Sequence, residues 1–518
     1  MTRRRSGPVP VPDSLRGAPE GAERVGELDP EEPLALTVHF RRRSPAPRTG
    51  GAADLARFNR QRSRSALDNE RRRTHAAAAH RVQAFFEASD VAVRDVDFTS
   101  RKMTIEAPAR VLTGLFHAEV ALYRADGDAF LARTGTLQAP RAIAPWTRAI
   151  VGFDQRPLPP RPALVGGDPA GALWPTEVAA LYGVPLDRDV SKVCVGIIAL
   201  RGAYRRGDLD AALTRMQRDA PEIVEIDVDG QRVNFGVYAR GDQELALDLQ
   251  ILAALLPHAR IVLYFAANSQ DGIGQALDKA IHDPVNRPSV ISLSWGVTEV
   301  YWTEPRREVV NAALADAMRY RVTVVAASGD RLATCGEPDG RAHVWFPASS
   351  PMVLSCGGTA FDLAGGAIAA ERVWKDGAVG GGGGVSDYFD VADFQTGAGI
   401  PPSVNDGLRR GRGVPDVAAL ASEAPGYRIV YNDAEVAMGG TSAGTPLWAG
   451  ILAIAKAASG NAFGLVNPKL YAQAALFRQI TQGDNMVGRV GYEAHRGWNA
   501  CAGLGVPLGA AIVGALAQ

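Results

Sequence analysis

The amino-acid sequence predicts an α/β protein in which a doubly wound parallel sheet follows a smaller α+β unit. Three observations carry this prediction. Apolar strand-like runs alternate with helical segments after residue 172, one helix and several short strands occur earlier, and a segment rich in proline and glycine separates the two regions. Near-continuous apolar strands divided by helices are typical of parallel sheets that are covered on both faces. The chain has 518 residues, enough for two folded units with linkers.

The region before the predicted sheet divides into three parts. Residues 1–30 are rich in Pro, Gly, Arg and Glu, a composition that predicts disorder. Residues 31–155 contain a strand pattern at Leu34–Phe40, a helix pattern at about Asn69–Ala88 and further short strand-like runs, which together predict an α+β unit. Residues 156–172 are rich in proline and glycine, and we expect an extended, exposed linker that is open to proteolysis.

Residues 173–518 carry the predicted parallel sheet. Apolar runs such as VCVGIIAL, RIVLYFA and VTVVAAS are interpreted as strands, and runs such as ELALDLQILAALL and VVNAALADAMRY as helices. No apolar run reaches about 18 residues, so the sequence predicts no membrane-spanning helix. A conventional signal peptide is not visible at the N-terminus, because no apolar stretch follows its basic residues.

Composition and charge argue against several classes of function. The 56 basic residues balance the 56 acidic ones, so no overall field favours nucleic acid or an anionic membrane. The 4 cysteines show no CxxC spacing, which argues against structural zinc and against a disulfide scaffold. Whether Cys335 and Cys356 pair stays open at this point.

Ser442 is the strongest candidate for a reactive group. It lies in the motif GGTSAG, which begins at Gly439, just before an apolar helical run at Leu447–Ala457. A serine at a helix start has its own backbone N–H free, and the helix dipole favours negative charge that develops there. The alternative is an N-cap serine in a tight turn with no catalytic role.

Two carboxylic acids are the candidate base for this serine. Four of the eight histidines fall in the predicted N-terminal unit, and His258 and His282 follow helical segments. Glu244 and Asp248 are spaced i, i+4, so both carboxyl groups share one face of a helix that is otherwise apolar. Buried acids are costly unless they are used, and a close pair titrates as a unit. The alternative is an exposed acidic pair on a surface helix.

Asp330 is the third candidate acid. It follows a predicted strand at Val322–Ala327, in the motif ASGD. The carboxyl edge of a parallel sheet is where such folds place catalytic groups. The alternative is an aspartate that only forms a turn.

A set of motifs in order resembles the sedolisins, or serine-carboxyl peptidases, and in particular the kumamolisin-like proenzymes. The motifs are ExxLD at Glu244–Asp248, SLSWG at Ser292–Gly296, SGD at Ser328–Asp330, FPASSP at Phe346–Pro351, GGT at Gly357–Thr359, GGTSAGTPLWAG at Gly439–Gly450, NPKLY at Asn467–Tyr471 and GLGVP at Gly503–Pro507. Each motif alone is weak, whereas the ordered set is highly specific. The resemblance covers the chain from about Leu34 to its end.

The resemblance implies a subtilisin-like fold and a serine-type endopeptidase that works at acidic pH. It assigns Ser442 as the nucleophile, Glu244 as the general base, Asp248 as the residue that orients Glu244, and Asp330 to the oxyanion hole. Residues 31–155 resemble an inhibitory prodomain, which the enzyme itself removes within the linker at residues 156–172. We expect a monomer that acts on peptides or proteins, is exported, and has no nucleic-acid or membrane partner.

The resemblance also implies a substrate cleft between two backbone segments. Ser294, Trp295 and Gly296 resemble the strand that pairs with the substrate backbone. Gly381–Ser386, which includes Gly383 and Gly384, resembles the opposite wall.

The chain departs from the family pattern at two places. Family members often extend the proton relay with a glutamate, where this chain has Ala199 in GIIALRG. They also bind calcium through an aspartate before Ile-Thr and another after Gly-Trp, where this chain has Gln479 and Asn499; His495 replaces a small residue as well. Because calcium needs carboxylate oxygens, we predict no tight calcium and no other cofactor. Asp484 and Glu493 lie nearby as possible replacements.

Two other functions compete with this interpretation. GTSAG also fits the nucleophile elbow of esterases, in which case Asp484 and His495 are the natural partners of Ser442. A peptide-binding pseudo-peptidase is the second alternative, because the relay and calcium positions are altered.

Overall fold

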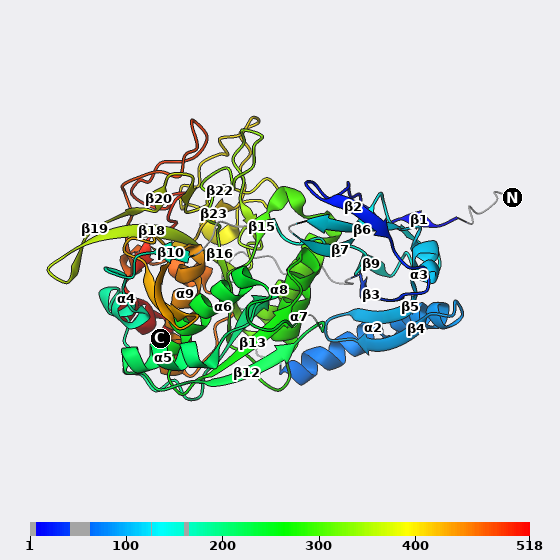
Figure 1. The fold of residues 1–518 in the computed structure, drawn as a ribbon, viewed down its shortest axis with the longest axis horizontal. Coiled ribbons are helices and arrows are strands. Elements are labelled where there is room, and N and C mark those ends of the chain that lie inside the picture. Colours follow the sequence, from blue (N-terminus) through cyan, green and yellow to red (C-terminus); the bar gives the residue numbers. More distant parts are fainter. Residues whose placement is uncertain (1–6, 42–62, 126, 160–164, 231) are drawn as a thin grey trace.

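The computed structural model describes residues 7–41, 63–125, 127–159, 165–230 and 232–518. These residues form two domains that lie side by side, each with its own apolar core (Figure 1). In the segment that connects the two domains in the sequence, β10 (Val165–Gly167) pairs with β26 (Ala434–Met438) of the larger domain, so part of the predicted linker is a strand. Among the described residues, no helix is long and apolar enough to cross a membrane.

The larger, C-terminal domain is built on an eight-stranded sheet. Its strand order is β12-β13-β11-β14-β16-β18-β19, and β24 also pairs with β18. Every neighbouring pair is parallel except β18 and β19. The strands are β11 (Cys194–Leu200), β12 (Glu222–Asp227), β13 (Arg260–Ala266), β14 (Val290–Leu293), β16 (Thr323–Ala327), β18 (Leu354–Ala364), β19 (Ala367–Val373) and β24 (Val417–Leu420).

Side chains of the central strands alternate between two apolar cores. In β11, Val195 and Ile197 belong to one core, whereas Ile198 and Leu200 belong to the other. This alternation follows from the two-residue period of a strand, and it explains why β11 is apolar without interruption. The predicted doubly wound architecture is therefore confirmed.

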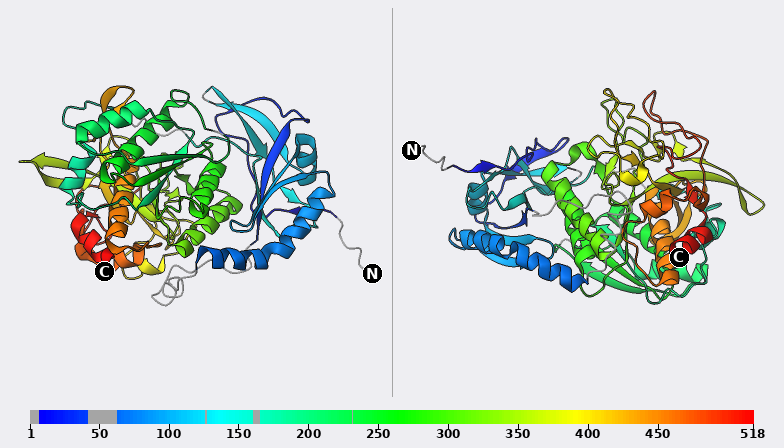
Figure 2. Two further views of the ribbon diagram at one scale, coloured as in Figure 1. Left: turned by 90° about the horizontal axis from the view of Figure 1, so that it is seen from below. Right: turned by 180° about the vertical axis from the view of Figure 1, so that it is seen from behind.

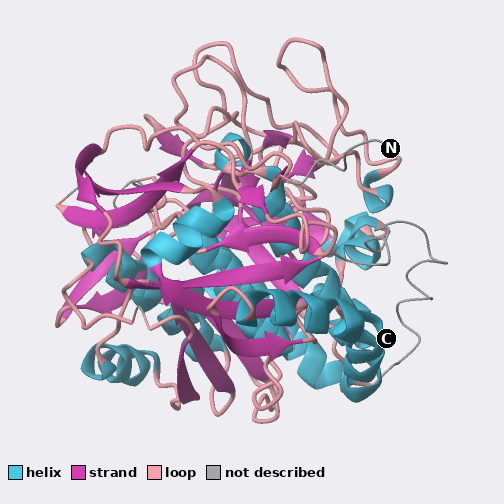
Figure 3. Ribbon diagram, turned by 90° about the vertical axis from the view of Figure 1, so that its right-hand side faces the viewer, coloured by secondary structure: helices cyan, strands magenta, loops and turns pink. Residues whose placement is uncertain are grey.

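Helices cover both faces of this sheet. One core contains side chains of α4 (Pro175–Leu181), α5 (Arg206–Met216), α6 (Ala239–Leu255), α9 (Thr441–Ser459) and α11 (Gly509–Ala517). The other contains side chains of α7 (Gln270–His282) and α8 (Glu304–Tyr320). Long loops gather along one edge of the molecule, above the sheet (Figure 3).

The smaller, N-terminal domain is the predicted α+β unit. Its main sheet has the antiparallel order β4-β5-β3-β9, and a second sheet has the order β2-β6-β7. Its core includes Leu36, Val38, Phe86, Met103 and Phe116. The elements are β3 (Pro33–Phe40), α2 (Arg64–Glu87), β4 (Ala92–Asp97), β5 (Lys102–Pro108), α3 (Ala109–Phe116), β6 (Glu119–Ala125), β7 (Asp128–Thr134), β8 (Gln138–Ala139) and β9 (Thr147–Val151).

The prediction of disorder for residues 1–30 is wrong for the part that the structure describes. Strand β1 (Val9–Pro10) pairs with β8, and β2 (Glu23–Glu27) pairs with β6. Both strands are short and largely exposed, so the chain carries no periodic apolar signal there. Their order comes from backbone hydrogen bonds to strands far along the sequence: Val9 pairs with Ala139, and Glu27 pairs with Ala121. Residues 1–6 lie outside the described residues.

Buried ion pairs join the two domains across α7 and α8, the helices that face the N-terminal domain in Figures 1 and 2. Asp316 of α8, with a fully buried side chain, pairs with Arg71 at 2.6 Å and with Arg101 at 2.7 Å. Asp278 of α7 pairs with Lys102 at 2.5 Å. Burial alone would raise the pKa of Asp316, but the Arg101 guanidinium and His282 outweigh it and hold that pKa well below its usual range.

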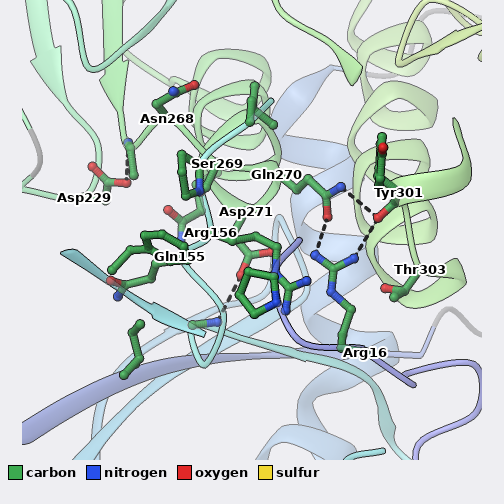
Figure 4. Close-up of a pocket in the computed structure, with 18 of the residues that line it drawn as sticks. Arg16, Gln155, Arg156, Asp229, Asn268, Ser269, Gln270, Asp271, Tyr301 and Thr303 are labelled. Atoms are coloured by element: carbon green, nitrogen blue, oxygen red, sulfur yellow. Dashed lines mark hydrogen bonds between the residues drawn. The ribbon is translucent and has the colours of Figure 1, made fainter. Parts of the chain in front are cut away.

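Arg16 extends this interface from the segment that was predicted to be disordered. Its guanidinium group donates to Tyr301 O at 2.8 Å and to Gln270 Oε1 at 3.3 Å (Figure 4). It also pairs with Asp154 at 2.9 Å. Tyr301 and Gln270 belong to the C-terminal domain, whereas Asp154 belongs to the end of the N-terminal domain. Arg16 therefore forms hydrogen bonds or ion pairs with residues of both domains.

Candidate active site

Ser442 is the second residue of α9, and its side chain is buried. The preceding Gly440 has φ = 100°, a left-handed conformation that lets the chain enter the helix sharply. Ser442 Oγ lies 3.5 Å from the backbone oxygen of Ser294, and Ser294 Oγ lies 3.4 Å from that of Ser442. The candidate nucleophile therefore lies against the residue that follows β14.

Glu244 and Asp248 lie one turn apart on α6, as predicted, and both are buried. The alternative of an exposed acidic pair is excluded by this burial. Asp248 Oδ1 accepts a hydrogen bond from Ser294 Oγ at 2.8 Å. Ser294 thus contacts both Asp248 and Ser442, which brings the helix of the acids to the helix of the serine. The direct approach of the Glu244 carboxyl group to Ser442 Oγ stays a prediction.

Asp330 lies at the start of α9, beside Ser442, and is buried. The residue follows β16 through Gly329, whose φ of 105° turns the chain toward α9. Asp330 Oδ1 accepts hydrogen bonds from Thr441 N at 2.7 Å and from Thr441 Oγ1 at 2.8 Å. The N-terminal end of a helix has unpaired N–H groups, so the carboxyl group also caps α9.

The segment that was predicted to be one cleft wall, Ser294 to Gly296, connects β14 to β15 (Val297–Thr298). The opposite predicted wall begins beside Asp330. Gly382 N donates to Gly329 O at 2.8 Å, and Gly382 O accepts from Ser328 Oγ at 2.7 Å. This pairing places the glycine-rich segment next to the acid that was predicted to form the oxyanion hole.

The glycines in that segment have structural reasons of their own. A Cβ atom on Gly383 would lie 2.0 Å from Ala500 O, and one on Gly384, where φ is 158°, would lie 3.2 Å from the Tyr492 ring. Only glycine therefore fits where the segment packs against the C-terminal loops. The substrate-binding roles of Gly383 and Gly384 stay predictions.

Two residues of this region were missed by sequence reasoning. Thr441 anchors Asp330, although it was only quoted as part of a motif. Glu299, a buried residue that follows β15, accepts hydrogen bonds from Ser386 Oγ at 2.7 Å and from Asp387 N at 3.2 Å, so it joins the chain just after one predicted wall to the end of the other. Burial raises the pKa of Glu299 to about 7. A single glutamate in the segment VTEVYW carries no periodic signal of such burial.

The esterase alternative finds no support in the contacts of its candidate residues. Asp484 accepts from Lys375 Nζ at 2.6 Å and from Met486 N at 2.9 Å. The exposed His495 lies with Nδ1 3.0 Å from Arg496 O. Cys335 and Cys356, whose pairing the sequence left open, are both free thiols.

The predicted calcium position holds an amide in place of a carboxylate. Asn499, a buried residue, donates from Nδ2 to Ile480 O at 3.1 Å and to His495 O at 3.0 Å. Its Oδ1 accepts from Cys501 N at 3.1 Å and from Ala502 N at 3.0 Å. Two donors and two acceptors of one amide are thus used, which fixes its orientation. The oxygens of Ile480 and His495 therefore face an N–H donor in this structure, and the absence of tight calcium stays a prediction.

Comparison with known proteins agrees with this fold. Residues 20–156 match the family "Pro-kumamolisin, activation domain", and residues 238–492 match the "Subtilase family". The chain is 34% identical to kumamolisin from Bacillus sp. (strain MN-32), across 97% of this chain and 94% of that protein. It is 28% identical to tripeptidyl-peptidase 1 from Homo sapiens, across 96% of this chain and 94% of that protein.

A solved structure gives the same result. The chain resembles Pseudomonas sedolisin with a TM-score of 0.59 and 26% identity, over 66% of this chain and 97% of that one. The doubly wound sheet, the buried serine at the start of α9 and the buried acids around it define a serine-type peptidase that is preceded by a prodomain. The chain belongs to the serine-carboxyl peptidases, the family of kumamolisin and sedolisin.

Proposed function

We propose that Ser442, Glu244, Asp248 and Asp330 together hydrolyse peptide bonds. Ser442 Oγ attacks the peptide carbonyl carbon while Glu244 takes its proton, which Glu244 then returns to the leaving amine. Asp248 orients Glu244, and neutral Asp330 donates a hydrogen bond to the oxyanion. The observation that carries this assignment is the convergence on α9: Ser294 contacts both Asp248 and Ser442, and Thr441 binds Asp330.

We also propose an acidic working range. Asp330 has a hydrogen atom to donate only when its carboxyl group is protonated, so the oxyanion loses this donor as the pH rises. Kinetics of the processed enzyme on a peptide test this proposal. Equal activity at about pH 4 and about pH 8 would contradict it.

The substrate backbone is proposed to lie between Ser294–Gly296 and Gly381–Ser386. An extended peptide that adds to these backbone segments forms main-chain hydrogen bonds whatever its sequence. The position of Gly382 beside Gly329, next to Asp330, supports the assignment.

The prodomain is proposed to inhibit the enzyme until the enzyme cuts its own linker. Buried ion pairs at Asp316 and Asp278 hold the two domains together, and a linker rich in proline and glycine is a good site for cleavage. We further propose that the protein is exported and acts as a monomer, as its resemblance to the family implies.

Incubation of the full-length chain at about pH 4 tests the catalytic proposal. We expect a shortened chain whose new N-terminus falls within the linker or a few residues after it. Ser442→Ala should leave the chain intact under the same conditions. If the Ser442→Ala chain is shortened as fast as the wild-type chain, the proposed nucleophile is wrong. Hydrolysis of short-chain esters that survives Glu244→Gln would favour the esterase alternative instead.

A second proposal concerns calcium. We propose that the C-terminal loop closes without a cation, because Asn499 supplies the N–H groups that hold Ile480 O and His495 O in place. Gln479 supports it, since its Oε1 accepts a hydrogen bond from Gly497 N at 3.2 Å. Asp484, a possible replacement ligand, is already paired with Lys375. Micromolar binding of calcium in a calorimetric titration would refute this proposal.

A further inference from the structure

One oxygen of Asp330 is occupied by Thr441. Oδ1 accepts both the backbone N–H of Thr441, at 2.7 Å, and the hydroxyl of the same residue, at 2.8 Å. Asp330 and Thr441 are both buried, so water does not compete for these positions. A carboxyl oxygen has two lone pairs for hydrogen bonds, and Thr441 fills both.

The direction of the hydroxyl hydrogen follows from its other neighbour. Thr441 Oγ1 accepts a hydrogen bond from Gly329 N at 3.1 Å. A hydroxyl group has a single hydrogen, and here the remaining partner in reach is Asp330 Oδ1. The hydroxyl therefore donates to Asp330 while it accepts from Gly329, and it holds the acid to the turn that precedes it.

These contacts decide where a proton on Asp330 can reside. A hydrogen on Oδ1 would point toward the N–H and O–H donors of Thr441, which is unfavourable. Thr441 leaves the lone pairs of Oδ2 open, so the proton of the neutral acid resides on Oδ2. We propose that Thr441 is a positioning residue that reserves the proton of neutral Asp330 for Oδ2, so that this oxygen donates to the oxyanion. The inference rests on the proposed role of Asp330 in peptide hydrolysis.

The consequence for catalysis concerns orientation. If the proton were on the other oxygen, or if the carboxyl group rotated, a lone pair would face the negative oxyanion and repel it. Loss of the hydroxyl should therefore lower kcat and leave KM nearly unchanged, because the affected contact is made to the oxyanion and not to the bound peptide.

The test compares Thr441→Val, which removes the hydroxyl at constant shape, with Thr441→Ser, which keeps it. Thr445→Val is the matched control, because Thr445 is a buried threonine of the same helix whose hydroxyl donates to Thr441 O at 2.9 Å. The readouts are the self-processing rate of the full-length chain and kcat and KM on a peptide. Processing in trans by added wild-type enzyme supplies mature protein if a variant does not mature alone. Thermal unfolding reports folding.

We expect Thr441→Val to lower kcat about 10- to 100-fold, and Thr441→Ser and Thr445→Val to stay near the wild type. Equal kcat for Thr441→Val and wild type would overturn the inference, and so would equal losses in Thr441→Val and Thr445→Val. If Thr441→Val does not fold, Thr441→Ala takes its place and the same outcomes apply. A wild-type chain that lacks peptidase activity, or an active Ser442→Ala variant, would instead overturn the proposed function itself.

Discussion

Ser294 Oγ donates a hydrogen bond of 2.8 Å to Asp248 Oδ1, and Ser294 Oγ also lies 3.4 Å from the backbone oxygen of Ser442. The residue joins the helix of the candidate base to the helix of the candidate nucleophile. The sequence predicted Ser294 only as part of the substrate-binding strand. Its side chain has a second task in the structure, which is to fix the carboxyl group of Asp248.

Replacement of Ser294 by alanine should therefore lower kcat on a peptide substrate. A hydrogen bond to a charged group contributes about 1.5–3 kcal/mol, so we expect a loss of about 10-fold or more. Ser292→Ala is the control, because Ser292 is also buried and its Oγ has no hydrogen-bond partner among the described residues. Equal kcat values for the two variants would argue that Ser294 does not position Asp248.

Asp330→Ala should lower kcat about 10²- to 10³-fold, because removal of one oxyanion donor has an effect of this size in serine peptidases. It should also lower the thermal stability slightly, since α9 loses its cap. The variant can be matured with added wild-type enzyme, and kcat is then measured after the wild-type enzyme has been removed. A full-length chain of this variant that processes itself at the wild-type rate would exclude Asp330 from the oxyanion hole.

His39 should make docking of the prodomain weaker in acid. The residue lies on β3 and faces Asp278 and Asp271 of α7 as well as Lys102 and Arg101 of its own domain. Burial, only partly offset by Asp278, lowers its pKa to about 4. The undocked prodomain binds a proton below about pH 6.5, whereas the docked one does not until about pH 4, so acid favours release by at most about 3 kcal/mol.

Hydrogen exchange at the interface measures this effect without cleavage if the full-length chain carries Ser442→Ala. We expect the protection factors of interface amides, corrected for the intrinsic pH dependence of exchange, to fall as the pH falls from about 6.5 to about 4, and to change less when His39→Gln is added. Asp278 and Asp316 should contribute little to the pH dependence over this range. Burial raises the pKa of each carboxyl group, but the charge of Lys102 beside Asp278 and of Arg101 beside Asp316 helps to hold both pKa values well below the usual range. The same pH dependence with and without His39 would contradict the prediction.

Asn499→Asp should make the C-terminal loop dependent on calcium. A carboxylate at this position replaces the Nδ2 donor with an oxygen that faces Ile480 O and His495 O, which repel it unless a cation lies between them. We expect the thermal unfolding temperature to fall in a chelator and to rise again with millimolar calcium, whereas the wild type should respond to neither. Asn405→Asp, in another buried loop whose amide donates to Ala342 O and accepts from Ala342 N, is the control. A similar calcium response in both variants would point to a general effect of added charge.

The parts of the fold that follow a local period could be predicted from the sequence. Strand β11 is apolar throughout, β13 is apolar after Arg260, and both were recognised; α6 was correctly expected to be buried with its two acids. Strand β12, in contrast, lies at the sheet edge, where none of its residues is fully buried, and it was missed. Strand β2 was missed because pairing with β6, a non-local contact, determines it.

In the candidate site, too, local patterns could be read from the sequence and long-range contacts could not. Motifs and the cost of buried charge selected Ser442, Glu244, Asp248 and Asp330 as candidates, and the structure shows that all four are buried. The contact between Asp330 and Thr441 could not be predicted, because 111 residues separate them and no pattern in either segment indicates which residue it contacts. The bond of Arg16 to Tyr301 was hidden for the same reason, within a segment whose composition indicates disorder.

The pairing of β10 with β26 has a consequence for the kinetics of maturation. Val165 of the linker lies opposite Met438, which precedes Ser442 by four residues in the chain. The linker in which we propose cleavage and the proposed nucleophile are thus tethered to one another within a single molecule, at an effective concentration that no second molecule in solution can match. Maturation should accordingly follow a single exponential whose half-time is unchanged when the protein is diluted.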